Sequence, residues 1–271
     1  MLLPAHKALK DTASRSWYLD PIVARQKQQV HLELVTRWTT QTAGRLLKTD
    51  LFEEGNGADQ LLFDLRDQCA MPIGLDHDFD IVARARKRCP SGRAIGFLVA
   101  DVRSIPFKAD SVDVLVSSST LDHFSNKRDF ELALQELGRV LRPGGVLILT
   151  LDNPLNPLYW PLRWLSIAGP FRLGYTPLPG SLRRQLARLG FEVMGSATLL
   201  HNPRVVSTLL FLAVRSVMGR KGDAVIRALL NFFALFERLP TRRFTCCFNG
   251  FMARKPRSLV GTASTIRGFV R

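Results

Sequence analysis

The sequence predicts an α/β fold in which helices cover both faces of a mostly parallel sheet. Three short apolar runs rich in β-branched residues are typical of strands buried on both faces, and they lie at Ile95–Ala100, Val112–Val116 and Val146–Leu151. Between the last two runs, residues 129–141 place their apolar side chains along one helical stripe, which a Pro-Gly-Gly turn at 143–145 ends. This βαβ unit predicts a parallel sheet whose ligands bind at the carboxyl ends of its strands.

Length and composition indicate one folded domain with additions. A chain of 271 residues with 46% hydrophobic content buries a substantial core and is not a disordered chain. The net charge of +15 is uneven, since residues 1–156 hold 20 Lys/Arg and 20 Asp/Glu, whereas residues 157–271 hold 18 and 3. This asymmetry suggests an anionic substrate, an anionic membrane surface or nucleic acid, and a solvated Arg-rich face is the alternative.

The cysteines and the apolar segments bear on location. Cys69, Cys89, Cys246 and Cys247 lack the spacing of a metal site, so we expect reduced thiols and no bound metal. The N-terminus holds no continuous apolar segment of the kind found in signal peptides, and nowhere do 18 apolar residues run together. We therefore expect a cytoplasmic protein without a transmembrane helix.

The remaining core elements follow from the same periodicities. An arm and a helix from Pro21 to about Ala43 make up an N-terminal segment, residues 1–43. The core spans residues 44–203. Its first half holds a strand, a glycine loop, a helix, a strand and a helix, expected at Arg45–Phe52, 53–57, Ala58–Gln68, Met71–Asp76 and Ile81–Arg88. A helix at Ser181–Leu189 and a strand from Gly190 to about Leu200 end the core.

Beyond the core we expect a helical insertion at residues 204–239 and a closing strand within residues 240–256. The insertion holds two helices, Val205–Met218 and Ala224–Leu239, and the first is apolar nearly all round. The favoured role of this insertion is either a helical cap that covers an apolar pocket or a contact between two copies of the chain. Because Arg residues interrupt both helices, an interfacial hairpin on anionic lipid is the alternative. The tail at residues 257–271 is expected to be disordered.

An acidic residue, Asp76, stands at the carboxyl end of the second expected strand and is followed by His77 and Asp78. A carboxylate at this position suits a ribose, because both vicinal hydroxyls can donate hydrogen bonds to its oxygens. The alternative is that Asp76 only caps the following helix. We favour the ribose and count Asp76 and His77 as cofactor-binding residues.

Three ordered segments carry a family resemblance. They read VADVRSIPF from Val99, SVDVLVSSSTLDHF from Ser111 and LRPGGVLILT from Leu141. Together they resemble the core of a class I S-adenosylmethionine-dependent methyltransferase and are most similar to the small-molecule branch called type 11. The resemblance covers roughly residues 44–152. It implies a Rossmann-like, seven-stranded, mostly parallel sheet with an antiparallel closing strand, and S-adenosylmethionine as the cofactor.

The resemblance also implies that Asp50 ends the first strand and that a glycine turn follows it, so that the backbone can approach the cofactor. Here the sequence departs from the family, because Phe52 and Glu54 stand where glycines are expected and Gly55 and Gly57 come later. Three alternatives follow. The later glycines make the close approach on a longer loop, the cofactor site is altered, or the glycines form a plain flexible turn.

Further cofactor contacts are implied after the third and fourth strands. In the resembled family, the acid corresponding to Asp101 accepts a hydrogen bond from the adenine amino group, with Val102 beside the ring. Ser117 and Ser118 lie near where the methionine part would bind. As single residues, all of these also suit ordinary loop and turn roles.

His123 is the candidate general base for an acceptor hydroxyl, because histidine titrates near neutrality. The adjacent Asp122 is the candidate to orient it. The alternative is that His123 only lines the following loop, since alignment of the acceptor with the methyl group can supply much of the rate acceleration.

The predicted function is methyl transfer from S-adenosylmethionine to an oxygen, nitrogen or carbon of a small or lipid-like acceptor, with peripheral contact to an anionic membrane as an extension. A non-catalytic binding or scaffold protein with a degenerate cofactor loop is the main alternative. A nicotinamide-dependent enzyme is disfavoured because no G-x-G-x-x-G follows the first strand. Nucleic acid is not the expected substrate, because only the charge suggests it; the oligomeric state stays open.

Overall fold

The computed structural model describes residues 20–39, 43–92, 94–166 and 173–257. The arm expected before residue 20 and the tail expected after residue 257 lie outside these residues. The predicted division of the chain into segments stays a prediction.

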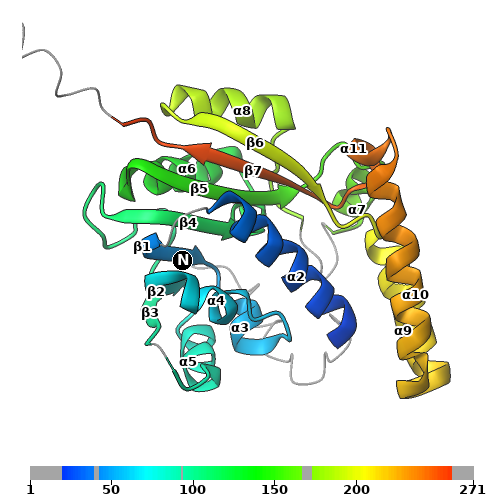
Figure 1. Cartoon of the computed structure of the whole chain (residues 1–271). Coiled ribbons are helices and arrows are strands. Elements are labelled where there is room, and N and C mark those ends of the chain that lie inside the picture. Colours follow the sequence, from blue (N-terminus) through cyan, green and yellow to red (C-terminus); the bar gives the residue numbers. More distant parts are fainter. Residues whose placement is uncertain (1–19, 40–42, 93, 167–172, 258–271) are drawn as a thin grey trace, which may run out of the picture.

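A seven-stranded sheet with the order β3-β2-β1-β4-β5-β7-β6 forms the centre of the structure (Figure 1). Its strands are β1 (Ala43–Thr49), β2 (Cys69–Asp76), β3 (Gly96–Val99), β4 (Val112–Ser118), β5 (Leu141–Asp152), β6 (Glu192–Leu199) and β7 (Phe248–Arg254). Strands β1 to β5 pair in parallel, and β7 lies antiparallel between β5 and β6. This arrangement confirms the predicted fold class.

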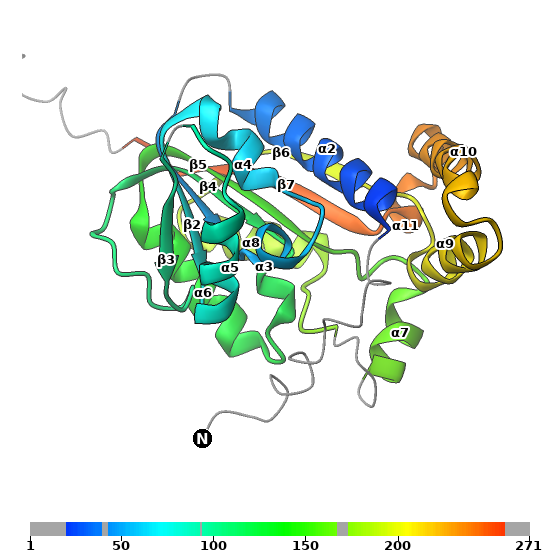
Figure 2. The ribbon, with the colours of Figure 1, turned by 90° about the horizontal axis from the view of Figure 1, so that it is seen from below.

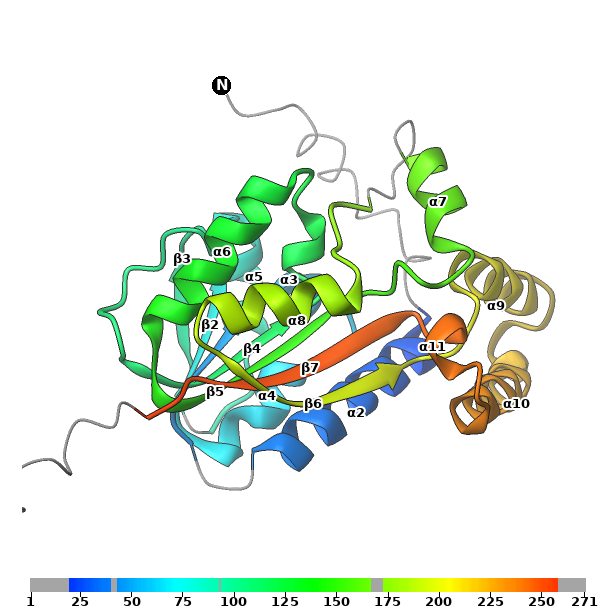
Figure 3. The ribbon, with the colours of Figure 1, turned by 90° about the horizontal axis from the view of Figure 1, so that it is seen from above.

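Helices cover both faces of the sheet. Figure 3 shows α6 (Lys127–Val140) and α8 (Pro179–Arg188) on one face, and α2 (Pro21–Trp38) and α4 (Leu61–Leu65) on the other. Helix α5 (Phe79–Arg88) packs into the same buried cluster as α2 and α4.

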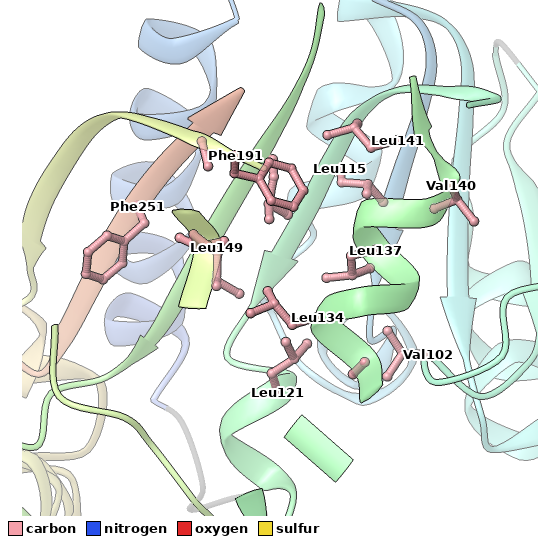
Figure 4. Close-up of a cluster of buried hydrophobic side chains, with 14 of the residues drawn as sticks. Val102, Leu115, Leu121, Leu134, Leu137, Val140, Leu141, Leu149, Phe191 and Phe251 are labelled. Carbon is pink, nitrogen blue, oxygen red and sulfur yellow. The ribbon is translucent and has the colours of Figure 1, made fainter. Parts of the chain in front are cut away.

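Alternating side chains of the central strands explain why both faces are covered. Leu115 of β4 joins the cluster under α6 and α8, whereas its neighbours Val114 and Val116 join the cluster under α2, α4 and α5. Figure 4 shows Leu134 and Leu137 of α6 packing into the first cluster. A strand that is buried on both faces therefore reads as a continuous apolar run, which is the pattern that the sequence shows.

The start of β5 differs from the expected turn. Residues 142–145 belong to β5 itself, and the pairing of β4 with β5 is irregular between Val112 and Val114. Gly144 has a φ of 80°, which favours glycine, and its N–H donates a hydrogen bond to the carbonyl of Lys255 at 2.7 Å. The Pro-Gly-Gly sequence therefore forms a bulged strand start.

The segment after β1 also differs from expectation. The first strand ends at Thr49, Asp50 turns the chain with a φ of 70°, and a short helix α3 (Phe52–Asn56) replaces the expected loop at 53–57. The next helix is α4, which begins only at Leu61, and it runs into the 3-10 helix η2 (Arg66–Gln68). The reason is tertiary, because α3 packs directly on α5.

The C-terminal helices lie beyond the carboxyl end of β5 (Figures 1 and 2). They are α7 (Tyr159–Ser166), α9 (Arg204–Met218), η4 (Gly219–Gly222), α10 (Asp223–Ala234), η5 (Leu235–Arg238) and α11 (Arg242–Thr245). Helices α9 and α10 form a hairpin in which Phe211, Ile226 and Leu230 are buried against Ile22 and Val23 of α2. Arg215 of α9 fastens the hairpin through ion pairs with Asp20 and Asp223. Among the described residues, no helix combines the length and apolarity needed to span a membrane.

Candidate functional site

Three acids gather at one edge of the sheet because adjacent parallel strands end there. Asp50 follows β1, Asp76 ends β2 and Asp101 follows β3. The register places Thr49 beside Leu75 and Asp76 beside Val99. The sequence therefore located the carboxylates correctly at the carboxyl edge, where open α/β sheets bind ligands.

Asp76 is the most firmly held of the three. Its side chain is 5% exposed, and its two oxygens accept hydrogen bonds from the N–H groups of Leu51 and Asp78, both at 2.9 Å. Burial alone would raise its pKa, but hydrogen bonds from His77 and from these backbone groups outweigh burial and lower the pKa. The exposed His77 gains a raised pKa from the same contact. The cap of α5 is Asp78, which accepts from the N–H groups of Asp80 and Ile81, so Asp76 is not the helix cap.

Asp50 is half-buried, and one oxygen accepts a hydrogen bond from the N–H of Phe52 at 2.7 Å. Burial raises its pKa, and the neighbouring Asp76 carboxylate raises it further, while Lys48 and His123 act in the opposite direction. The chain thus presents one firmly ionised carboxylate, Asp76, beside a carboxyl group that holds its proton more tightly.

Glu54 stands where the family has a glycine, and it forms a buried ion pair with Lys48. The ammonium of Lys48, in β1, donates to Oε2 of Glu54 at 2.9 Å and to the carbonyl of Asp50 at 2.6 Å. Lys48 is 4% exposed and Glu54 is 0% exposed, and the second Glu54 oxygen accepts from the N–H of Leu62 at 2.9 Å. Burial alone would lower the pKa of Lys48, but its attraction to Glu54 and Asp50 raises it. This pair was not predicted from the sequence, in which a lysine inside an apolar strand is the signal for a buried ion pair.

The expectation that Gly55 approaches the cofactor is wrong, whereas the expectation for Gly57 stays a prediction. A Cβ at Gly55 would lie 3.0 Å from the carbonyl of Ile81, because α5 fills that space. A Cβ at Gly57 would lie 2.0 Å from Oε2 of Glu53, and its carbonyl accepts from Arg88. Gly55 therefore permits close packing on α5 and leaves no room for a ligand at its Cα, whereas the atom nearest to Gly57 is the end of the flexible Glu53 side chain.

Asp101 is half-exposed, and both of its oxygens accept hydrogen bonds from the guanidinium of Arg103. The hydrogen bond from Arg103 lowers its pKa. Arg103 also pairs with Asp129 at 2.9 Å and lies over the ring of Phe124 at 5.3 Å. The side chain of Val102 is buried in the core under α6 (Figure 4), so only its backbone lies at the edge.

Hydroxyl groups line the space between β1 and β4. Ser117 is buried, and its Oγ accepts a hydrogen bond from Thr49 at 3.0 Å, while the Thr120 hydroxyl lies 2.9 Å from that of Thr49. Ser118 is half-buried and lies next to Thr150 of β5 in the sheet register. Thr49 and Thr120 extend the predicted serine site.

The structure contradicts the expectation that Asp122 orients His123. Both residues lie in the 3-10 turn η3 (Leu121–His123). Asp122 is buried and accepts from the N–H of Asp152 at 2.8 Å and from Oγ of Ser119 at 3.0 Å, whereas His123 is exposed. Adjacent residues of a tight turn point in different directions, so Asp122 ties η3 to β5 and does not orient His123. His123 interacts instead with the carboxyl group of Asp50 and partly offsets the rise in the pKa of that group.

Two segments that follow β5 close over η3. A Cβ at Gly174 would lie 2.2 Å from the carbonyl of Asp122, and the N–H of Tyr175 donates to the carbonyl of Phe124 at 2.6 Å. The hydroxyl of Tyr159 in α7 donates to the carbonyl of Gly174 at 3.3 Å. The proline-containing segment after Asp152 therefore leads into a segment that covers η3.

Other polar groups near this edge are structural. His31 of α2 is buried, its Nδ1 donates to the carbonyl of Lys27 at 2.8 Å, and burial lowers its pKa to about 4. Among the described residues, no cluster of three His, Cys, Asp or Glu side chains could hold a metal ion. A cavity of about 120 Å³ lies between α2, the end of β6 and α10, and none of the three acids lines it.

Residues 52–149 match a family model described as a methyltransferase domain. A "Probable S-adenosylmethionine-dependent methyltransferase" of Mycolicibacterium smegmatis is 31% identical over 181 residues, which are 63% of this chain and 61% of that protein. A demethylmenaquinone methyltransferase of Thermus thermophilus is 35% identical over 104 residues, 38% of this chain and 46% of that protein. The chain spans less than two thirds of each of these relatives.

Two solved structures share the fold over most of the chain. An S-adenosylmethionine-dependent methyltransferase from Thermotoga maritima superposes with a TM-score of 0.58 at 17% identity, covering 93% of this chain and 98% of that one. Another from Mesorhizobium loti gives 0.55 at 19% identity, covering 82% and 96%. At these identities the likeness shows the fold.

Proposed function

We propose that residues 52–149 form a class I S-adenosylmethionine-dependent methyltransferase domain and that the protein transfers the methyl group of this cofactor to a small or lipid-like acceptor. The observation that carries the proposal is the row of acids Asp50, Asp76 and Asp101 at the carboxyl ends of three adjacent strands, the last two of which lie within the matched residues. The sulfonium of the cofactor supplies an electrophilic methyl group when bound.

Asp76 is the residue best suited to hold the ribose. Its lowered pKa keeps it ionised at neutral pH, and a carboxylate that accepts two backbone N–H groups has lone pairs left for further donors. Asp101 suits an amino group that shares its oxygens with Arg103. The turn at residues 50–52, held by Asp76, stands where the glycine turn of the family is expected.

His123 is the proposed base for the acceptor proton. It is exposed at the carboxyl ends of the strands and lies close enough to the Asp50 carboxyl group to interact with it electrostatically. Asp122 acts indirectly by fixing the turn that carries His123. The relatives named as demethylmenaquinone and ubiquinone/menaquinone methyltransferases support an apolar, lipid-like acceptor. The relatives named as tRNA methyltransferases match only 28% of this chain, so nucleic acid is the weaker candidate.

Calorimetric titration with S-adenosylmethionine and S-adenosylhomocysteine tests the proposal. We expect binding to the wild type and a loss of at least about tenfold, or 1.4 kcal/mol, in Asp76→Asn and Asp101→Asn. Asp67→Asn, at an exposed carboxylate in η2, is the matched control, and circular dichroism confirms folding. Absence of binding to the folded wild type would refute methyl transfer and favour the scaffold alternative.

A further inference from the structure

We propose that one outer face of the C-terminal helices docks peripherally on an anionic lipid bilayer. This face, called the apolar face, is formed by α7, α9, α10 and η5. Its members are large apolar side chains that are at least half exposed: Trp160, Trp164, Val206, Leu209, Val217, Phe232 and Leu235. Trp164 is 79% exposed and Val217 is 84% exposed, which is unusual for side chains of this size.

Helical spacing gives α9 and α10 each an exposed apolar side. Leu209, Ala213 and Val217 recur every four residues on α9, opposite Phe211, which is buried against α10 and α2. On α10, the exposed Phe232 lies opposite the buried Ile226 and Leu230. Helix α7, which carries Trp160 and Trp164, lies near the end of α9 that follows β6 (Figure 1). Each helix thus has one side packed inward and one apolar side facing outward.

The net positive charge around the apolar face indicates which kind of partner binds there. Residues 206–244 hold seven Arg/Lys and two Asp/Glu. Exposed basic residues stand at both ends of the hairpin, with Arg220 and Lys221 in η4, and Arg238, Arg242 and Arg243 at the other end. An apolar strip between basic clusters matches a bilayer surface, where apolar side chains enter the acyl boundary and long basic side chains reach lipid phosphates.

The same charges argue against a second copy of the chain as the occupant. Two apposed copies would bring their basic clusters together, and like charges across an interface oppose association. Anionic lipids neutralise them. Because no described helix is able to cross a bilayer, the contact is peripheral.

The apolar face is firmly connected to the candidate site. Asn153 and Asn156, directly after β5, donate hydrogen bonds to the carbonyl of Cys246 at 3.0 Å and so fix the junction between α11 and β7. Tyr159 of α7 contacts the segment that covers η3. A bilayer bound to this face would therefore lie next to the carboxyl edge of the sheet, where a membrane-dissolved acceptor could enter. The docking itself does not depend on methyl transfer.

Vesicle sedimentation of the full chain tests the docking, with phosphatidylcholine vesicles compared with vesicles that also contain phosphatidylserine. We expect binding only to the anionic vesicles and weaker binding at high salt. The double substitution Trp164→Ser/Val217→Ser should weaken binding at least tenfold. Phe79→Ser, at a 70% exposed side chain of α5, is its control and should bind like the wild type.

The charge requirement has its own matched pair. Arg220→Gln/Lys221→Gln should weaken binding severalfold, whereas Arg86→Gln/Lys87→Gln, at another exposed Arg-Lys pair, should not. Wild-type protein that stays in the supernatant, or apolar-face variants that bind normally, would overturn the proposal. So would concentration-dependent dimers that Trp164→Ser/Val217→Ser abolishes. Cofactor titration of the same samples separates this outcome from failure of the proposed function.

Discussion

Replacing Glu54 by leucine should leave the Lys48 ammonium buried without its carboxylate partner. The two groups are 2.9 Å apart and only 0% and 4% exposed, so water cannot take the place of the lost carboxylate. Removal of one partner of such a pair costs about 3–5 kcal/mol, and the Leu62 N–H also loses its acceptor. We therefore expect Glu54→Leu to lower the free energy of unfolding by about 4 kcal/mol.

A double-mutant cycle separates the charge from the packing. In Lys48→Met/Glu54→Leu no charge is left buried. The Leu62 N–H, which is already unpaired in Glu54→Leu, and the Asp50 carbonyl then lack their partners, at about 1–3 kcal/mol each, which is less than the cost of an unpaired buried ammonium. The double variant should thus be more stable than Glu54→Leu alone. Urea unfolding at pH 7, followed by circular dichroism, measures the four proteins of the cycle: the wild type, Glu54→Leu, Lys48→Met and the double variant. Glu131→Gln, in the exposed pair with Lys127, is the control and should cost less than about 0.5 kcal/mol. A cost below about 1 kcal/mol for Glu54→Leu, or a double variant less stable than the single one, would refute this reasoning.

Three further predictions follow from buried groups and close packing. Because the pKa of His31 is lowered to about 4, below its unfolded value, its stabilising contribution is complete above about pH 6.5 and is lost as the pH falls toward 4. His31→Phe should therefore remove about 2 kcal/mol of the stability loss seen in urea unfolding between pH 7 and 5, and an unchanged loss would contradict a neutral buried imidazole. Gly55→Ala should destabilise by about 1–3 kcal/mol because its Cβ meets α5, whereas Gly180→Ala, with open space around it, should not lower the melting temperature. Asp122→Ala should cost about 2 kcal/mol of stability through its lost hydrogen bonds, and His123→Ala less than about 0.5, so equal losses would contradict the opposite orientations of the two side chains.

The sequence by itself determined the architecture. A strand buried on both faces must be apolar throughout, so β4 and β5 were visible as β-branched runs, and α6 between them as one helical stripe. It also located the acids Asp50, Asp76 and Asp101, because the end of a parallel strand is itself the edge that meets ligands. These features depend on local periodicity and on the chain order of the strands, both of which are written in the sequence.

Only the tertiary structure decided what each polar group contacts. A glycine in a sequence does not reveal whether its missing Cβ makes room for a ligand or for another helix, and for Gly55 the answer is α5. The partner of Asp122 is the backbone of Asp152, thirty residues later in the chain, and not the adjacent His123. Lys48 and Glu54 form an ion pair at the expected glycine turn because the fold buries both side chains next to each other. Directional contacts depend on where distant segments meet, and a linear pattern does not encode that position.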